Sequence, residues 1–147
     1  MRVAVAFGLL AALALSTPSF AAGEIGRVKS VTGVATVTRG KDKPAQLARG
    51  QLLRVSDVIQ TGKDGGLGIT FLDNSRFAVG PNTNLALNQF EFDKTTQRGR
   101  FESQLNKGTI AVVSGQIAKE KGADAMRVRT PVSVLAARGT RFVVQVP

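Results

Sequence analysis

The chain has 147 residues and a formal net charge of +10, and hydrophobic residues make up 43% of it, which suits a folded domain with its own core. Cys, His, Trp and Tyr are all missing, which excludes disulfides, the usual general base, a thiol nucleophile and the common zinc and copper ligands. The positive charge favours an anionic partner (nucleic acid, lipid headgroups or an acidic polymer), or it serves only to keep a self-repelling surface soluble.

The first segment predicts an export signal. Arg2 supplies a charged start, residues 3–15 form an apolar run too short to span a bilayer, and Ser19-Phe20-Ala21 places small residues where signal peptidase reads. We expect a cleaved signal peptide at residues 1–21, no stable membrane span, and a periplasmic or secreted mature protein of charge 10 − 1 = +9. A permanent N-terminal anchor is the alternative. Export makes nucleic acid an unexpected partner.

After Gly23 the chain consists of short β-type runs divided by turn residues. In the first run, the valines at positions 31, 34 and 37 break strict alternation at Gly33, which indicates a bulge or a bend. The clearest hairpin has Leu67, Ile69 and Phe71 on one face, a turn at residues 73–75, and Phe77 and Val79 returning on one face. The second strand of this hairpin is therefore expected to end before the Gly80-Pro81-Asn82 turn.

The second half continues this pattern. Leu85 and Leu87 share one parity and Phe90 and Phe92 the other, so a bulge is expected at residues 88–89. Residues 94–99 predict a loop, and the strand at residues 101–105 is expected to turn at residues 106–108 into another at 109–117. Residues 119–124 predict an exposed loop, after which the residues at 126 and 128 face inward and Arg127 and Arg129 outward.

The closing stretch predicts two more strands. Val132 and Val134 alternate with small or polar residues, as do Phe142, Val144 and Val146, and Pro131 is expected at the first position of its strand. Arg138-Gly139-Thr140 predicts a bend between them. The ten to twelve short strands indicate an all-β fold, a single compact domain at residues 24–147 with mostly antiparallel strands, arranged as a sandwich or a short β-solenoid.

Five short motifs follow one another along the chain. They are Gly26-Arg27-Val28 with Val31-Thr32-Gly33, Leu47-Ala48-Arg49-Gly50 followed by residues 55–62, Phe71-Leu72-Asp73-Asn74-Ser75, Leu105-Asn106-Lys107-Gly108-Thr109-Ile110, and Thr130-Pro131 with residues 136–144. In their order and spacing these motifs resemble the FecR domain family. The motif positions to which the resemblance gives a structural role are Gly50, Asp57, Thr61, Gly108, Thr130, Pro131, Arg138, Gly139, Thr140 and Phe142.

The resemblance implies an all-β extracytoplasmic module. In the best-known members this module passes a signal from an outer-membrane siderophore receptor to a sigma factor. We expect the present chain to depart from that plan, with no cytoplasmic helical segment before the apolar run, no lasting membrane span and no extra domain after Val146. We therefore expect a stand-alone secreted module without the sigma-regulating role, and the family supplies no catalytic residues.

The acidic residues sit mostly in predicted turns, namely Asp42, Asp64, Asp73, Asp93 and Asp124, where a carboxylate bonds to nearby backbone amides. Asp57 is the best candidate for a buried acid, and we expect it to hold a turn. No serine has a histidine to activate it, so we predict no catalytic residue, no metal site and no cofactor. The missing Trp and Tyr also disfavour sugar stacking.

The basic residues are the remaining feature of the sequence that indicates a binding surface. If the last strands pair, Arg127, Arg129 and Arg141 form one outward stripe that Arg98 and Arg100 extend. Guanidinium binds carboxylate and phosphate bidentately, so the stripe predicts a face for peptidoglycan, lipopolysaccharide or an acidic protein; the alternative is a solvated face that resists edge aggregation. The sequence thus predicts a non-catalytic binding or signalling module, with a structural or assembly protein of the envelope as the second hypothesis and an enzyme as the weakest.

Overall fold

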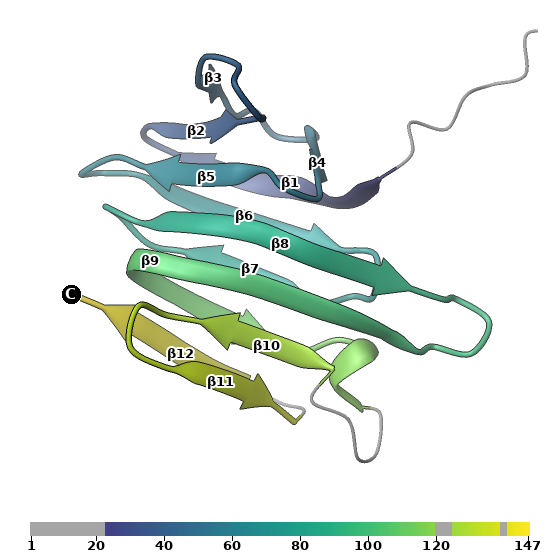
Figure 1. Cartoon of the computed structure of the whole chain (residues 1–147). Coiled ribbons are helices and arrows are strands. Elements are labelled where there is room, and N and C mark those ends of the chain that lie inside the picture. Colours follow the sequence, from purple (N-terminus) through teal and green to yellow (C-terminus); the bar gives the residue numbers. More distant parts are fainter. Residues whose placement is uncertain (1–22, 120–124, 139–140) are drawn as a thin grey trace, which may run out of the picture.

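The computed structural model describes residues 23–119, 125–138 and 141–147, so the expected signal peptide and most of the 119–124 loop lie outside the described residues. Twelve strands and one 3₁₀ helix form the described secondary structure (Figure 1), which confirms the all-β prediction. Their bounds are β1 Glu24–Thr32, β2 Ala35–Thr38, β3 Ala45–Gln46, β4 Leu52–Arg54, β5 Val58–Thr61, β6 Gly66–Phe71, β7 Arg76–Val79, β8 Asn84–Phe92, β9 Gly99–Val113, η1 Ile117–Lys119, β10 Met126–Arg129, β11 Val134–Ala137 and β12 Arg141–Val146.

The strands form one curled sheet whose two halves lie over one another as layers (Figure 1). The front layer contains, in order, β3, β2, β5, β8, the first half of β9, β10 and β11. The back layer contains β4, β1, β6, β7, the second half of β9, and β12. Every pairing is antiparallel except the parallel pair of β9 and β10, as the sequence led us to expect.

Strand β9 joins the two layers. The sequence predicted a turn at residues 106–108 between two strands, and this prediction is wrong, because one continuous strand runs from Gly99 to Val113. The chain bends within that strand at Gly108, whose φ of 97° is a conformation that side chains disfavour. The bend also changes the parity, so that Leu105 before it and Ile110 after it both point into the core.

The core lies between the layers and is built around phenylalanine rings. Phe71 and Phe77 come from the back layer and Phe90 and Phe101 from the front. The ring centroids of Phe71 and Phe101 are 4.7 Å apart in an edge-on arrangement, and those of Phe77 and Phe101 are 5.3 Å apart. Each such buried ring stabilises the fold by about 2 kcal/mol, so these contacts hold the two layers face to face.

Two local predictions are confirmed. The hairpin of β6 and β7 pairs Ile69 with Phe77 and Leu67 with Val79, and all four side chains are buried. Strand β8 has its register shift between Leu87 and Gln89, as the parity change required.

The prediction of a strand is wrong at residues 131–133, although Val134 does lie in a strand. Pro131 and Val132 lie in a turn rather than a strand, and Val132 is 93% exposed. The turn forms because Thr130 Oγ1 accepts a hydrogen bond from the Ser133 amide at 3.0 Å, while the Thr130 amide donates to the Ser133 carbonyl at 2.8 Å. Strand β11 therefore begins at Val134, and its inward side is occupied by Leu135, which pairs with buried Val128.

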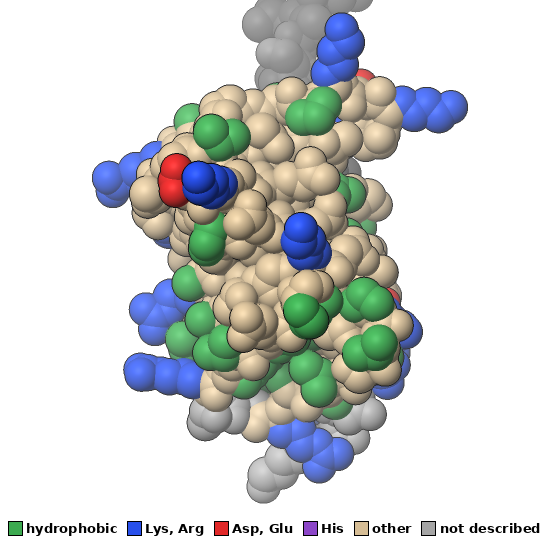
Figure 2. Space-filling view, turned by 90° about the vertical axis from the view of Figure 1, so that its left-hand side faces the viewer, with side chains coloured by type: hydrophobic (Ala, Val, Ile, Leu, Met, Phe, Trp, Pro, Cys, Tyr) green, Lys and Arg blue, Asp and Glu red, His purple; other side chains and the backbone are tan. Residues whose placement is uncertain are grey.

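The layers end differently at their two edges. At one edge lie β3 and β4, which have only two and three residues. At the other lie β11 and β12, and within the described part of the chain each of these pairs along one side only. Figure 2 looks along the strands, at the side of the molecule that lies on the left in Figure 1. Hydrophobic side chains gather over the lower half of this side, toward β11 and β12.

Candidate binding surface

The five arginines expected to form one stripe are divided between the layers. Arg127 and Arg129 lie half-buried on the outward side of β10 in the front layer. Arg141 belongs to β12, which pairs with the second half of β9 in the back layer. The expected pairing of the last strands is therefore wrong for β12. Its true partner is the part of β9 that lies after the bend at Gly108, and this places Arg141 on the opposite face of the molecule.

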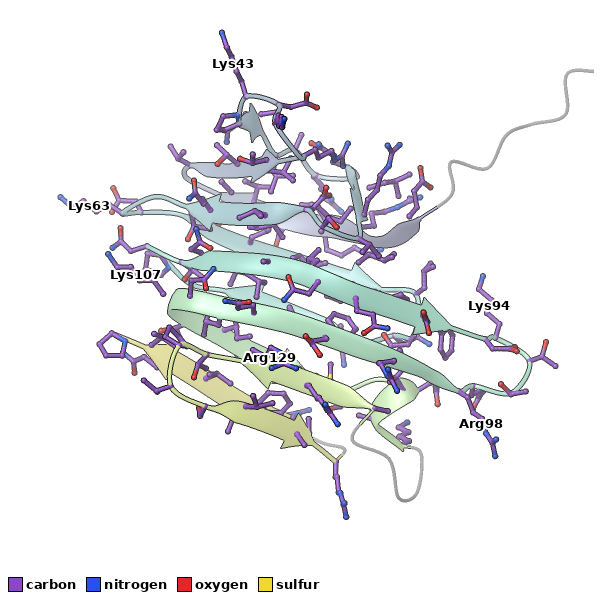
Figure 3. The ribbon with its side chains drawn as sticks, viewed as in Figure 1. Lys43, Lys63, Lys94, Arg98, Lys107 and Arg129 are labelled. Carbon is purple, nitrogen blue, oxygen red and sulfur yellow. The ribbon has the colours of Figure 1, made fainter. Side chains whose placement is uncertain are left out.

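Of the other two predicted arginines, Arg100 shares the outward side of the front layer with Arg127 and Arg129, whereas Arg98 does not extend the group. Arg98 lies in the loop between β8 and β9, which projects at the far end of the molecule from the turn that joins β10 to β11 (Figure 3). Arg100 lies at the start of β9 and stands opposite Glu91 of β8. Figure 3 also shows Arg129 lying over β10, well separated from Arg98.

On the front layer the basic residues alternate with carboxylates. Arg129 Nε donates to Glu102 Oε1 at 2.7 Å, and Arg127 stands opposite Glu102 in the parallel pairing of β10 and β9. Together with the Arg100 and Glu91 pair, these contacts leave the outward side of this layer with both signs of charge. A mixed surface of this kind attracts anions weakly, because the carboxylates cancel much of the local field.

The back layer presents a different pattern. Its antiparallel pairings align Arg27 of β1, Thr70 of β6, Arg76 of β7, Val113 of β9 and Arg141 of β12 in one row across the strands. Residues that stand opposite each other in a sheet point to the same side, and all three arginines are exposed. They recur at every second strand, which places neighbouring arginines about 10 Å apart. We call these three residues the arginine row.

The arginine row has no counter-charge among the described residues. None of its three guanidiniums makes a hydrogen bond or ion pair with another described residue. Glu24, at the start of β1, is the carboxylate nearest to it along a strand, and it stands opposite Arg54 of β4. The row therefore presents uncompensated positive charge that is open to solvent.

A recess lies beside the arginine row. The next row of outward residues across the same strands is Ser30, Gly68, Ala78, Ala111 and Val143. Because its central three side chains are absent or single methyl groups, a hollow of about 650 Å³ opens there. The walls of this hollow include Lys29, Arg76 and Arg141, and none of the carboxylates that the structure describes lines it.

Of the carboxylates that the structure describes, the two buried most deeply have structural partners. Asp57 accepts hydrogen bonds from Arg39 Nε at 3.0 Å and from the Arg54 amide at 2.9 Å, and so closes the turn before β5. Asp73 accepts hydrogen bonds from the amide and hydroxyl of Ser75 at 3.0 and 2.6 Å. Within residues 23–119, 125–138 and 141–147, no group of three His, Cys, Asp or Glu side chains is placed to hold a metal ion.

Several of the motif positions quoted for the family lie at bends or turns of the backbone. Gly50 has a φ of 89°, and Gly108 marks the bend in β9. The Thr61 hydroxyl donates to the Gly80 carbonyl at 2.6 Å and accepts from the Thr83 amide at 3.0 Å, which ties the end of β5 to the loop before β8. The remaining positions are Thr130 and Pro131 in their turn, Arg138 after β11, half-buried Phe142 in β12, and Gly139 and Thr140, which lie outside the described residues.

A family model described as FecR protein matches residues 57–146, which is more than half of the chain and runs from β5 to β12. The chain belongs to the FecR family. FecR proteins are a non-enzymatic, signalling-related family whose domains are generally extracytoplasmic. No match was found among curated proteins or among solved structures. In the described part of this FecR protein, no helix has the length and hydropathy needed to cross a membrane.

Sequence reasoning missed Arg27, Arg76 and Lys29 on this FecR domain. The hairpin prediction contained part of the signal, because pairing Ile69 with Phe77 places Thr70 opposite Arg76 on the outward side. The alignment with Arg27 and Arg141 required the order of strands β1, β6, β7, β9 and β12, which turn residues and periodicity do not determine.

Proposed function

We propose that this FecR protein is a non-catalytic extracytoplasmic binding module in envelope signalling, which engages a protein or an anionic envelope component such as peptidoglycan or lipopolysaccharide. In this proposal residues 1–21 are a signal peptide that directs the chain to the periplasm or outside the cell, and residues 24–147 are the binding domain. The observation that supports the proposal is the arginine row on the back layer, which is exposed and has no ion pair among the described residues.

The physical chemistry of the row favours multivalent anions. A single exposed ion pair contributes at most about 1 kcal/mol, because water and salt screen it. Three guanidiniums that contact one polymer act together, since the second and third contacts form within a complex that already exists. Such binding should weaken steeply with salt, because the groups lie at the surface and the Debye length falls to about 3 Å at 1 M salt.

Cosedimentation with purified peptidoglycan, and capture on lipopolysaccharide-coated beads, test the proposal. The back-layer variant carries Arg27→Gln, Arg76→Gln and Arg141→Gln. We expect this variant to remain folded and to lose most retention at low salt. If the wild type is not retained on either material, or if the variant is retained as well as the wild type, the arginine row is not the binding surface.

A matched front-layer variant removes the same charge from the opposite face through Arg100→Gln, Arg127→Gln and Arg129→Gln. Because the carboxylates of Glu91 and Glu102 already offset these residues, we expect this variant to keep most of its binding. Equal loss in both variants would mean that net charge, rather than the arginine row, governs retention.

The second candidate function is a structural or assembly role in the envelope. It is favoured by the edge at which β11 and β12 lie, where Val134, Leu135 and Val143 are 51%, 41% and 67% exposed. Strands paired along one side, with apolar side chains, are surfaces to which other strands add. This role predicts oligomers that grow with protein concentration without any ligand, as measured by light scattering after size exclusion. A monomer at every concentration would reject it.

A further inference from the structure

The two rows of residues on the back layer determine how a ligand can lie relative to the strands. The arginine row and the row of small residues both run across β1, β6, β7, β9 and β12, perpendicular to the strands. Each row covers four strand spacings, which is about 19 Å. A ligand that fills the recess and contacts all three arginines must therefore lie across the strands as an elongated chain.

The recess suits only some elongated anions. An extended peptide binds a sheet by adding to its edge, and in the middle of the back layer the backbone groups of β6 and β7 are already used in pairing on both sides. Single-stranded nucleic acid stacks its bases on aromatic rings. The aromatic residues that line the recess in the described part of the chain are Phe77 and Phe142, and both lie at core-facing positions of their strands.

A bilayer surface also fits poorly. The floor at Gly68, Ala78 and Ala111 lies below the long side chains of Lys29, Arg76 and Arg141, which line the same hollow. A flat layer of headgroups would contact the tips of these side chains and leave the floor uncovered. A single polymer strand, by contrast, enters the hollow and contacts the floor and the walls together.

We infer that the recess binds a linear acidic polysaccharide, laid across the strands with its sugar rings on the Gly68, Ala78 and Ala111 floor and its carboxylates on the arginine row. This inference rests on the proposed function and names the ligand class for the same face. The apolar face of a sugar ring fits a floor of methyl groups and bare backbone. Each guanidinium donates two parallel hydrogen bonds to a carboxylate. The Thr70 hydroxyl stands between two arginines as a hydrogen-bonding partner for sugar hydroxyls.

The spacing of the arginines narrows the class of acidic polysaccharide that fits the recess. Because Thr70 and Val113 separate the arginines, positive charge recurs only at every second strand, about every 10 Å. A polysaccharide with a carboxylate on alternate sugars presents charge at a wider interval than one with a carboxylate on every sugar. The structure therefore assigns the recess to the alternating kind, since a fully charged chain would leave carboxylates over the uncharged Thr70 and Val113 positions.

The test measures binding of fluorescently labelled oligosaccharides by anisotropy at low salt. Hyaluronan oligosaccharides carry a carboxylate on every second sugar and are the main probe. Polygalacturonate carries one on every sugar, dextran is neutral, and polyphosphate reports unspecific attraction to positive charge. We expect hyaluronan to bind more tightly than polygalacturonate and dextran not to bind; polygalacturonate binding as tightly as hyaluronan would reject the assignment to the alternating kind. Hyaluronan binding no tighter than polyphosphate would overturn the inference.

A floor variant separates the recess from charge alone. Ala111→Phe fills the hollow with an exposed ring, keeps every charge and suits a strand. We expect it to weaken hyaluronan binding about tenfold, a loss of about 1.4 kcal/mol, and to leave polyphosphate binding unchanged. The matched control is Ala86→Phe, on the outward side of β8 opposite Gln104 in the front layer, which should change neither.

The outcomes distinguish the two levels of the proposal. If the back-layer arginine variant loses hyaluronan but Ala111→Phe does not, the polysaccharide inference is wrong and the anion-binding function stands. If Ala111→Phe fails to fold, Ala78→Leu fills the same floor with a smaller side chain and must show the same selective loss. If neither hyaluronan nor polyphosphate binds the wild type, both the inference and the anion-binding function fail.

Discussion

Removing the buried carboxylate of Asp73 tests whether the acidic residues of this FecR domain are structural. Asp73 is fully buried in the turn between β6 and β7. Its Oδ1 accepts a hydrogen bond from the Ser75 amide at 3.0 Å, and its Oδ2 accepts from the Ser75 hydroxyl at 2.6 Å and the Ile117 amide at 3.4 Å. The carboxylate thus ties the hairpin to the segment that follows β9.

The loss of stability expected from Asp73→Ala follows from the hydrogen bonds that this change removes. A hydrogen bond to a charged group contributes roughly 1.5 kcal/mol or more, and a buried donor left without a partner costs a similar amount. Asp73→Ala removes two short bonds and one long bond at a site without water access, so we expect the free energy of unfolding to fall by about 3 kcal/mol. This is a large part of the 5–15 kcal/mol that is typical of a folded domain.

Urea unfolding followed by far-UV circular dichroism is the suitable assay, because the chain has no Trp or Tyr for fluorescence. Asp93→Ala is the matched control. Asp93 also accepts a hydrogen bond from the backbone amide two residues on, that of Thr95, at 2.8 Å, but its side chain is exposed. This change should therefore lower the free energy of unfolding by less than about 1 kcal/mol. Equal, small effects at both positions would refute the structural role assigned to Asp73.

Three further predictions concern the packing. Gly108→Ala should destabilise the domain by about 3 kcal/mol or more, measured by the same urea titration, because φ is 97° there and a new Cβ would overlap Thr83. Ser103→Ala should raise the unfolding free energy by about 1 kcal/mol, since its buried hydroxyl has no partner among the described residues. Arg39→Gln should lower the melting temperature and cost about 2 kcal/mol, because it leaves the buried Asp57 carboxylate without its cation, although Arg39 itself is 34% exposed.

Each of these has a control and a contrary outcome. For Gly108 the control is Gly40→Ala, which places a Cβ in open space at a φ of 56° and should lower the free energy of unfolding by only about 1 kcal/mol. If Gly108→Ala lowers it by a similar amount, the new Cβ does not clash with Thr83. A Ser114→Ala change removes another buried hydroxyl without a described partner, and loss of stability in either serine variant would contradict the account. Arg54→Gln leaves the backbone bond to Asp57 in place, so it should cost less than Arg39→Gln.

Local structure followed from the sequence where the residues themselves determine it. The β6 and β7 hairpin and the bulge in β8 could be predicted because side-chain parity and turn residues are local properties. The bend at Gly108 was misread as a turn, since a glycine flanked by polar residues suits either a hairpin or a bend in one strand. At residues 130–133, the hydrogen bonds of Thr130 override the alternation of valines that suggested a strand.

The binding surface could not be assembled in the same way. Outward parity identified Arg127, Arg129 and Arg141 correctly as surface residues, but their grouping depends on which distant strands are neighbours. Because β12 pairs with the far half of β9, Arg141 joins Arg27 and Arg76 instead of Arg127 and Arg129. Pairing across long sequence separations reflects the packing of the whole core, which no short motif encodes.

The central claim is that anions bind on the outward side of the back layer, and amide chemical shifts measured during a titration with hyaluronan oligosaccharide test it most directly. We expect shifts concentrated at Thr70, Arg76, Ala111 and Val113, in the strands that carry the arginine row, with β10 and β11 unaffected. Shifts concentrated on β10 and β11, or spread evenly over both layers, would contradict it.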